Sequence, residues 1–589
     1  MEIFNKSGKP TLQSLMITWL TFGLSAMAQA SNEVVGPYGL DRDAYIIRYQ
    51  DVFAPVIGHQ AMVSTQNEHA TRIGLEVLRA GGNAVDASVA VGFALAVVLP
   101  RAGNLGGGGF MLLHSAAETS TVGLDYRETA PAGVTAQDFL TSDGEKDRAA
   151  RFEWPAVGVP GTVAGLHAAW QKYGSLPWQT LLNPAIELAE QGFPVSYDLA
   201  EILVIKREWL SKNAASKRAF YKPDGETYQP GDIMKRPDLA KTMKIIAEQG
   251  PEAFYKGALA KQIVADMKRH GGHITLKDLS FYQAIFRDVI QGSYRGYTIA
   301  AMPPPSSGGI AIVQMLNILE NFPLSSWGYS AQYVHVLAES MKLAFADRAE
   351  HLADPAFSKV PVEALINKPY AKSLAEKIKL NTVLKLAPVA QPPAKESPST
   401  THYSIVDSQG NAVSNTYTLS SSFGSGLTVA GTGILLNNQI HTFSVRAGIP
   451  GATGFIASHA NRVEPGKRPV SSQSPTIVLK DGKPFLIVGS PGGSRIINAV
   501  VQVISNVIDH EMNIAEATNQ RRIHHQWVPD KLEAEPGFNL DTIRLLESWG
   551  HQVETTFTMG STQSILITPH YLYGASDPRR PNALTLGLD

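Results

Sequence analysis

The stretch Ser-Pro-Ser-Thr-Thr-His-Tyr-Ser-Ile-Val at residues 397–406 opens a strand-like run directly after a polar, proline-containing segment, deep inside the chain. Side chains of an extended strand point alternately to its two faces. The pattern therefore predicts a strand with Thr401, Tyr403 and Ile405 on one face and with the other face beginning at Thr400. The question is why two adjacent threonines stand at this point.

A hairpin follows from the next fifteen residues. Asp-Ser-Gln-Gly-Asn at 407–411 supplies turn residues, and 412–421 reads as a second strand. A loop centred on Gln409 pairs residues whose numbers sum to 818, so Thr400 faces Thr418. Directly opposite residues have Cβ atoms about 4.5 to 5.5 Å apart, which lets two hydroxyls meet. Threonine is also an ordinary strand former, and the pattern alone leaves that alternative open.

Composition describes a globular protein with a neutral balance of charge. The 589 residues are 44% hydrophobic and 17% charged, with a formal net charge of -1. Such a chain can bury a sizeable core. It lacks the basic surplus that nucleic acid or anionic membranes attract. We therefore expect a small-molecule substrate and no nucleic-acid partner.

The first thirty residues have the pattern of a secretory signal. Lys6 and Lys9 precede an apolar run at 15–24, and Ala-Gln-Ala at 28–30 ends the segment. This order of basic, apolar and small residues predicts a signal peptide at 1–30 and a periplasmic or secreted protein. No later run reaches the length of a membrane span, so the mature protein is expected to have none. The chain contains no cysteine, which excludes disulfides, thiolate catalysis and cysteine metal sites.

The spacing of apolar residues changes along the chain, from a helical to a strand-like period. Apolar spacing predicts helices at 68–80, 84–99, 161–173, 178–191, 238–249 and 331–353. Alternation with Gly or Asp-Gly turns predicts strands within 109–127, 401–421, 474–489 and 563–573. Residues 383–399 contain four prolines, which is typical of an exposed linker. The prediction is an α+β fold, with a layered αββα arrangement and a flexible join.

Several separate motifs stand in a fixed order. They are Asn-Leu-Gly-Gly-Gly-Gly-Phe at 104–110, Asp-Tyr-Arg-Glu at 125–128, Thr-Thr-His-Tyr-Ser at 400–404, Gly-Ile-Leu-Leu-Asn-Asn-Gln at 433–439, Lys-Arg-Pro-Val-Ser-Ser at 467–472 and Gly-Ser-Pro-Gly-Gly-Ser at 489–494. Together they resemble the γ-glutamyltranspeptidase family of N-terminal-nucleophile (Ntn) hydrolases across nearly the whole mature chain. The resemblance implies a four-layer αββα sandwich of the Ntn type.

The resemblance also implies self-cleavage between Ser399 and Thr400. It would leave a large subunit of residues 31–399 and a small subunit of residues 400–589, associated as an intertwined heterodimer. Thr400 would then be a chain terminus whose α-amine serves as base for its own hydroxyl. An α-amine titrates at about 7.7 to 8.0, near the working pH, whereas a hydroxyl alone is a poor nucleophile.

Acyl transfer needs hydrogen-bond donors for the oxyanion. Pro-Gly-Gly-Ser at 491–494 offers successive backbone N–H groups, and the resemblance assigns this role to Gly492 and Gly493. The alternative is a tight strand-to-helix turn. Neither this loop nor the glycine run 106–109 is followed by the Lys-Ser or Lys-Thr of a phosphate-binding loop, so we expect 106–109 to permit close packing.

The resemblance assigns a carboxylate-binding role to Arg127, with Ser471 and Ser472 as hydroxyl donors to the same group. An arginine can hold a carboxylate bidentately. The resemblance also implies that Gln439 helps to hold the donor's α-amine. The predicted donor is a γ-glutamyl compound such as glutathione, and the acceptor is water, an amino acid or a peptide.

Three positions depart from the family pattern. Thr442 replaces the Asp that pairs with the ammonium, Ser420 replaces an Asn in the strand after the nucleophile, and Thr453 stands where a lid-loop aromatic is expected. Neutral Thr442 cannot supply a charge-assisted bond. We therefore leave open two alternatives: a glutaryl-type amide acylase on the same scaffold, and a periplasmic binding protein that has lost catalysis.

No metal or cofactor is predicted. His402, His524 and His525 lack a ligand spacing such as His-Glu-x-x-His, and we expect structural roles for them. No Gly-x-Ser-x-Gly elbow stands between a strand and a helix, which argues against a Ser-His-Asp hydrolase.

Overall fold

The computed structural model describes residues 52–386, 399–445 and 459–589. Within it, Pro55–Asp589 forms one compact unit. The predicted signal peptide at 1–30, most of the linker and Thr453 lie outside the described residues. In the described part of the chain, no helix has both the length and the apolar character that a membrane crossing requires.

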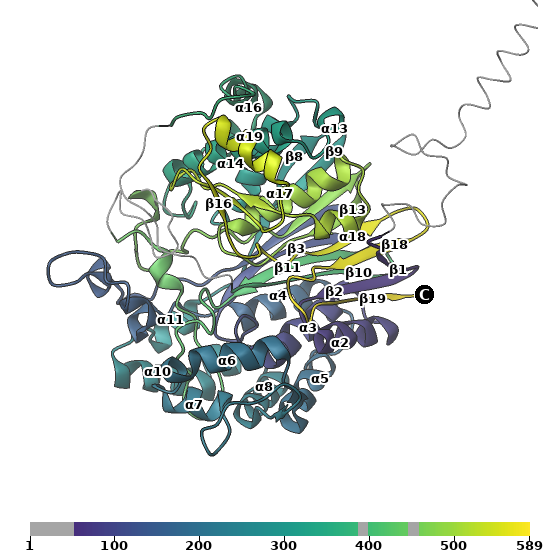
Figure 1. Ribbon diagram of the computed structural model, residues 1–589. Coiled ribbons are helices and arrows are strands. Elements are labelled where there is room, and N and C mark those ends of the chain that lie inside the picture. Colours follow the sequence, from purple (N-terminus) through teal and green to yellow (C-terminus); the bar gives the residue numbers. More distant parts are fainter. Residues whose placement is uncertain (1–51, 387–398, 446–458) are drawn as a thin grey trace, which may run out of the picture. The chain divides into compact units, whose positions relative to one another are not determined.

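Two antiparallel seven-stranded sheets form the centre of this unit (Figure 1). Each sheet takes strands from both sides of Thr400. The first sheet has the order β19 (Leu584–Leu588), β2 (Ala61–Thr65), β10 (Thr401–Val406), β11 (Ala412–Thr418), β3 (Gly108–Ser115), β4 (Ser120–Tyr126) and β7 (Ile285–Asp288). The second has the order β1 (Val56–Gly58), β18 (Leu572–Ser576), β17 (Gln563–Ile567), β13 (Lys483–Val488), β12 (Thr476–Lys480), β9 (Tyr297–Ala301) and β8 (Ile290–Tyr294).

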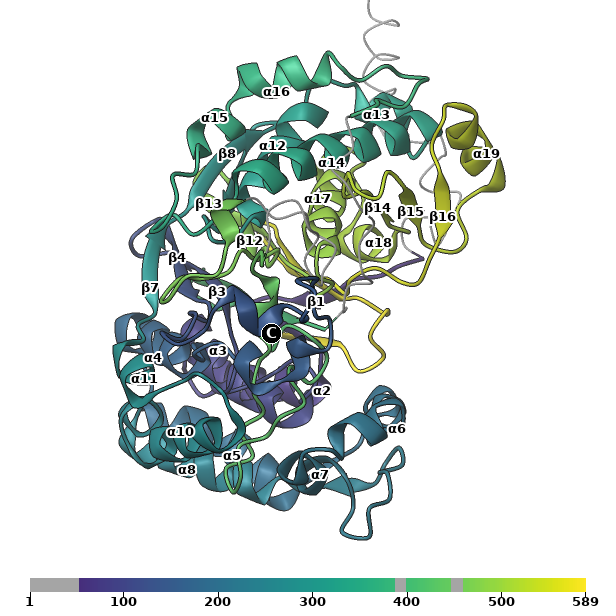
Figure 2. The ribbon, with the colours of Figure 1, turned by 90° about the vertical axis from the view of Figure 1, so that its left-hand side faces the viewer.

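Helices cover the outer face of each sheet, and Figure 2 shows the two helical layers on opposite sides of the strands. The layer on the first sheet includes α2 (Glu68–Arg79), α3 (Ala84–Val98), α4 (Thr162–Tyr173), α5 (Trp178–Gln191) and α8 (Pro237–Gln249). The layer on the second includes α12 (Gly308–Leu319), α14 (Ala331–His351), α17 (Arg495–Ile508) and α18 (Ile514–Asn519). The predicted α+β class and four-layer αββα order are confirmed.

Within the described residues, hydrophobic cores lie between successive layers. One lies between the first sheet and its helices and includes Tyr403 and Ile405. Another lies between the second sheet and α12, α14 and α17. A smaller core between the two sheets contains Val406, Phe110 and Ile477. Because β10 is buried on both faces, its polar side chains must find partners inside the protein.

The six predicted helices are present with ends within two residues of the expected positions. α3 begins with a capping box in which the Asn83 side chain accepts from the backbone of Val85 and Asp86. α14 begins after Ser330, whose hydroxyl accepts from Tyr333 N–H. Both caps are formed by a polar residue directly before the helix, so the local sequence is enough to predict them.

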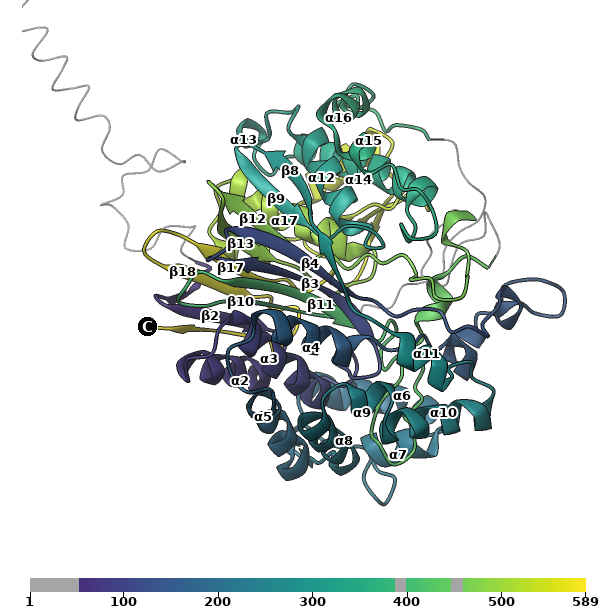
Figure 3. The ribbon, with the colours of Figure 1, turned by 180° about the vertical axis from the view of Figure 1, so that it is seen from behind.

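The hairpin register is confirmed. Thr401 pairs with Tyr417 and His402 with Thr416, so the paired numbers sum to 818. β11 also pairs with β3, which places Thr418 opposite Gly108, and Figure 3 shows β2, β10, β11, β3 and β4 side by side. The ordered strand begins at Thr401, one residue later than predicted.

The glycine run permits close packing, as expected. A Cβ on Gly106 would lie 2.2 Å from Leu435 O, and one on Gly107 would lie 2.2 Å from Thr418 O. Real Cβ atoms do not approach so closely, and only glycine allows these backbones to touch. The run therefore brings segment 418–436 against β3.

The beginning of the predicted linker does not behave as an exposed segment. Val383 is buried and its N–H donates to Trp549 O at 3.0 Å, while Leu384 N–H donates to Glu339 Oε2 at 2.8 Å. Proline-rich composition misses these contacts because they depend on α14 and on residues far along the chain. Ser399, at the other end, is also buried.

Candidate active site

Thr400 immediately precedes β10 and is buried. Its hydroxyl donates a hydrogen bond to Thr418 Oγ1 at 3.3 Å. Its neighbour Ser399 is also buried and forms a hydrogen bond with the same residue, Thr418. The two threonines meet because the hairpin register puts the start of β10 opposite the end of β11.

Thr418 connects the Thr400 hydroxyl to the peptide bond before it. Thr418 Oγ1 donates to the carbonyl oxygen of Ser399 at 2.9 Å and accepts from Ser420 N–H at 3.0 Å. A continuous chain of hydrogen bonds thus runs from Thr400 Oγ1 through Thr418 to Ser399 O. The chain can polarise that carbonyl and can carry a proton toward its oxygen.

Gly492 and Gly493 lie in the turn between β13 and α17. Their φ angles are +133° and +62°, which favour glycine, and α17 begins two residues later at Arg495. The start of this loop contacts β10, because a Cβ on Gly489 would lie 2.3 Å from the His402 ring. The loop is therefore a strand-to-helix turn held against the nucleophile strand, a place where backbone N–H groups can serve an oxyanion.

Arg127 follows β4 and is 2% exposed. Its Nε donates to Pro469 O at 3.3 Å and its Nη2 to Val470 O at 3.5 Å, while Nη1 lies 3.4 Å from Glu128 Oε2. The guanidinium thus contacts the two backbone carbonyls that immediately precede Ser471 and Ser472 in the chain.

The serine pair has a cationic partner that the sequence did not indicate. Arg348, near the end of α14, donates from Nη2 to Ser472 Oγ at 3.3 Å and from Nε to Ser307 Oγ at 2.8 Å. Ser307 Oγ in turn donates to Ser471 O at 2.8 Å. Arg348 therefore positions the serine pair and adds a positive charge to this side of the site.

Glu128 makes the carboxylate side sensitive to pH. Burial raises the pKa of Glu128 to about 7, with Arg127 acting in the opposite direction. Its Oε1 is buried and accepts no hydrogen bond from the described part of the chain. Asp125 is engaged by Arg468 at 3.0 Å and by Arg287 at 2.8 Å. The neighbourhood therefore has cationic groups in excess of its carboxylates, which suits an anionic ligand group.

Gln439 and Thr442 hold each other through a short 3-10 turn. Gln439 Nε2 donates to Thr442 Oγ1 at 3.2 Å, and Thr442 Oγ1 donates to Gln439 O at 2.7 Å. With its amide nitrogen held in this way, Gln439 Oε1 is buried and has no hydrogen-bond partner among the residues that the structure describes. An unpaired buried carbonyl is costly, and an ammonium donor would satisfy it.

One asparagine connects the two halves of the predicted donor pocket. Asn461 Nδ2 donates to Thr442 O at 3.1 Å, and its Oδ1 accepts from Val470 N–H at 3.1 Å. Val470 is the residue whose carbonyl Arg127 contacts. Asn461 therefore fixes the spacing between the predicted ammonium side and the predicted carboxylate side.

Ser420 lies next to the nucleophile pair in an unusual backbone conformation. Its φ is +82°, a left-handed value that Asn tolerates better than Ser. The adjacent Ser421 N–H donates to Asn438 Oδ1 at 3.0 Å, and Asn438 N–H donates to Leu419 O at 3.1 Å. These bonds bring the strand end and the Gln439 turn together.

The three predicted structural histidines are buried. His402 contacts Thr416 Oγ1 at 2.8 Å and Ser404 Oγ at 3.1 Å, and burial lowers its pKa to about 3. Burial also lowers the pKa of His524 and His525. A neutral buried imidazole with hydrogen-bond partners is typical of a packing role.

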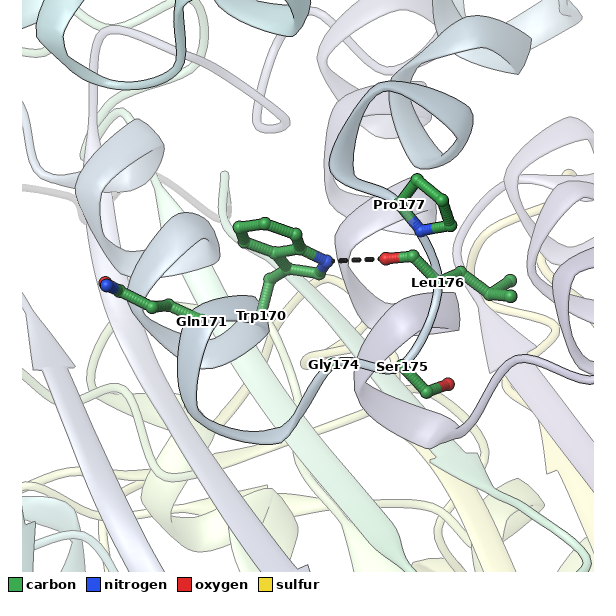
Figure 4. Close-up of a pocket in the computed structure, with 6 residues that line it drawn as sticks. All are labelled: Trp170, Gln171, Gly174, Ser175, Leu176 and Pro177. Atoms are coloured by element: carbon green, nitrogen blue, oxygen red, sulfur yellow. Dashed lines mark hydrogen bonds between the residues drawn. The ribbon is translucent and has the colours of Figure 1, made fainter.

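A surface pocket between α4 and α5 is separate from these groups. Figure 4 shows Trp170 at its wall, with Nε1 donating to Leu176 O at 2.8 Å. Its lining is completed by Gln171, Gly174, Ser175 and Pro177. It contains none of the predicted catalytic or donor-binding residues.

Two stacked antiparallel sheets between helical layers, with Thr400 just before a central strand and Thr418 at the end of the neighbouring strand, define the class of Ntn hydrolases. A model of the family described as Gamma-glutamyltranspeptidase matches residues 70–586. The "Glutathione hydrolase proenzyme" of Escherichia coli (strain K12) is 50% identical over 549 residues, covering 91% of this chain and 93% of that protein.

Two acylases are also similar. The "Acylase ACY 1 proenzyme" of Pseudomonas sp. (strain SE83) is 38% identical over 508 residues, covering 85% of this chain and 88% of that protein. The crystal structure of cephalosporin acylase from Bacillus halodurans matches with a TM-score of 0.81 and 28% identity, covering 94% of this chain and 99% of that chain.

The chain belongs to the gamma-glutamyltranspeptidase family. It is an enzyme of the γ-glutamyltransferase and hydrolase type, and the higher identity to the hydrolase relative than to the acylases favours that activity over acylase chemistry.

Arg348, Asn461 and Glu128 are functional candidates that the motifs did not single out. Arg348 and Asn461 lie outside the recognised motifs, and their partners are distant in sequence. Glu128 stands inside Asp-Tyr-Arg-Glu, but its raised pKa depends on burial that the motif does not reveal.

Proposed function

We propose that the chain cuts itself between Ser399 and Thr400 and then hydrolyses γ-glutamyl amides such as glutathione through an ester on Thr400. The observation that carries the proposal is the hydrogen-bond chain from Thr400 Oγ1 through Thr418 Oγ1 to Ser399 O, with distances of 3.3 and 2.9 Å. It couples the nucleophile to the carbonyl that it must attack.

In the cleavage step, Thr400 Oγ attacks the carbonyl carbon of Ser399. The C–N bond between the two residues breaks, an ester forms on Thr400 Oγ, and the proton moves to the Thr400 nitrogen. Water then hydrolyses the ester and leaves a carboxylate on Ser399 and a free α-amine on Thr400. The Thr418 hydroxyl, which donates to Ser399 O, supports the oxyanion in this step.

In turnover, the new α-amine takes the proton from Thr400 Oγ as the oxygen attacks the γ-carbonyl carbon of the donor. The C–N bond of the amide breaks, and the amine returns the proton to the leaving nitrogen. Water, or the amine of an acceptor, then attacks the γ-glutamyl ester. Gly492 and Gly493 are proposed to bind the oxyanion, since their loop is held against β10 at His402.

Donor recognition divides into two sides. The α-carboxylate is proposed to bind Arg127 with Ser471 and Ser472, where Arg348 adds charge. The α-ammonium is proposed to bind Gln439 Oε1, which is buried and unpaired. Thr442, held against Gln439, is neutral and supports the ammonium less strongly than a carboxylate would.

A glutaryl-type acylase is the second candidate, and Thr442 is the observation that favours it. A glutaryl amide has the carboxylate but no α-amine, so it needs only the Arg127 side of the pocket. The similarity to an acylase proenzyme and to a cephalosporin acylase structure supports keeping this candidate. We also propose export to the periplasm or medium, on the strength of the signal pattern at 1–30.

Intact mass spectrometry of the purified protein tests the proposal. Wild type should give two chains divided at 399/400 that co-elute, and Thr400→Ala should remain one chain. A wild type that stays uncut, with no turnover of γ-glutamyl anilide, would refute the enzyme and support a binding protein. A cut wild type that turns over glutaryl anilide alone would select the acylase.

A further inference from the structure

A group of three potential metal ligands lies in the second helical layer, away from the threonine pair. His335 and Glu339 stand one turn apart on α14, so their side chains share a face of the helix. His551, which follows α19 (Leu540–Ser548), completes the group. One imidazole nitrogen from each histidine and one carboxylate oxygen of Glu339 all lie within 4.8 Å of one another.

All three side chains are buried: His335 and Glu339 are 0% exposed and His551 is 6% exposed. His335 Nδ1 lies 2.7 Å from His551 Nε2. Buried imidazoles this close must share one proton or one cation, because two lone pairs facing each other repel.

The second nitrogen of His335 has the partner expected of a metal ligand. His335 Nε2 lies 2.8 Å from the carbonyl oxygen of Lys379, which can only accept. The proton must therefore be on Nε2, and Nδ1 presents its lone pair to His551. Metal-bound histidines commonly donate their other N–H to a backbone carbonyl in this way.

Glu339 has one oxygen to offer. Its Oε2 accepts from Leu384 N–H at 2.8 Å, whereas Oε1 is engaged by the ammonium group of Lys342. Lys342 Nζ lies 3.2 Å from Oε1, but it also contacts Asp530 Oδ1 at 2.9 Å and donates to Leu384 O at 3.0 Å. Lys342 can thus keep a counter-ion and a hydrogen bond if Oε1 turns to a cation.

We propose that His335 Nδ1, His551 Nε2 and Glu339 Oε1 form a binding site for a divalent transition metal of the zinc type. Two imidazoles and one carboxylate are ligands that Zn²⁺ accepts in a tetrahedral site, with water as the fourth ligand. The sequence pattern predicts no metal because His551 stands 216 residues after His335 and belongs to no short ligand motif.

The site joins the two chains that self-cleavage would produce. His335 and Glu339 precede residue 400, and His551 follows it. Lys379 and Leu384, whose backbones bind His335 and Glu339, lie in the last part of the large subunit that the structure describes before the cut. A bound metal would therefore fasten the end of the large subunit to the small subunit.

The test uses full-length protein without a histidine tag, produced in zinc-supplemented medium and freed of loose metal by gel filtration. Metal content per protein is measured for wild type, for the double variant His335→Gln/His551→Gln and for Glu339→Gln. His570→Gln, which removes an exposed histidine, is the matched control. This readout does not depend on catalysis or on self-cleavage.

Wild type and His570→Gln should each hold one zinc, the double variant none, and Glu339→Gln should bind zinc at least tenfold more weakly in a chelator competition. Equal metal content in wild type and the double variant overturns the proposal. If the double variant fails to fold, anomalous scattering from zinc-loaded wild-type crystals decides: a peak between His335 and His551 supports the site, and its absence overturns it.

Discussion

Replacing Thr442 with Asp tests the account of the donor pocket most sharply. Thr442 Oγ1 now accepts a hydrogen bond from Gln439 Nε2 at 3.2 Å and donates one to Gln439 O at 2.7 Å. A carboxylate keeps the acceptor role, loses the donor role and adds a negative charge. That charge should strengthen binding of the donor's α-ammonium, next to the unpaired Gln439 Oε1.

The size of the effect follows from the two kinds of hydrogen bond. A bond to a neutral partner contributes about 0.5 to 1.5 kcal/mol and one to a charged group about 1.5 to 3 kcal/mol. The gain of about 1.4 kcal/mol corresponds to roughly a tenfold change in rate constant. We therefore expect the ratio of kcat/KM for γ-glutamyl anilide over glutaryl anilide to rise about tenfold.

The assay compares these two anilides because they differ only in the α-amine, so effects on the carboxylate side and on chemistry cancel in the ratio. Thr442→Asn is the matched control, since it has the shape of Asp without the charge. Its ratio should stay within about twofold of wild type. If the Asp and Asn variants give the same ratio, the ammonium does not bind at Thr442 and the reasoning is refuted.

Three further predictions concern cleavage, pH and packing. Thr418→Val removes the hydrogen-bond donor to the scissile carbonyl. The rate of self-cleavage, measured by mass spectrometry, should fall roughly tenfold to a hundredfold. The control Thr401→Val removes a buried hydroxyl that has no hydrogen-bond partner among the described residues, and this variant should cut at the wild-type rate. Equal slowing in both variants would contradict the relay. Because burial raises the pKa of Glu128 to about 7, Glu128 is neutral below that pH and becomes an anion beside Arg127 above it. KM for the γ-glutamyl donor should therefore rise with pH through 7, and Glu128→Gln should flatten the rise relative to wild type; an unchanged profile would exclude Glu128. Gly107→Ala places a Cβ 2.2 Å from Thr418 O and should destabilise the protein by about 1 to 3 kcal/mol, seen as a lower Tm, while an unchanged Tm would show that β3 can shift.

The nucleophile hairpin could be predicted from the sequence because it depends on local information. Alternation across 400–406, the turn at 407–411 and the continuation to Thr418 set the register, and the observed pairs follow it. Close packing at the glycine run could also be predicted from local sequence, since consecutive residues without side chains indicate close backbone approach. Motif order indicated the family, and the family model and relatives confirm it.

The donor pocket could be predicted only as a set of residues, since its geometry depends on distant segments. Arg127 meets Pro469 and Val470 across more than 340 residues of chain, and nothing near either segment specifies the other. Composition also misled at Val383, where an expected exposed linker is buried against Trp549.

Local patterns in the sequence predict six of the helices, the hairpin that places Thr400 beside Thr418, and the family. The tertiary structure decided which charges and hydrogen-bond acceptors meet: Arg348 with Ser472, Asn461 with Thr442 and Val470, and His335 with His551. Side-chain periodicity and turn chemistry act over only a few residues, so they cannot specify such contacts. The packing of helices and loops onto the two stacked sheets is set by burial of the whole core, and this packing brings residues hundreds of positions apart into contact.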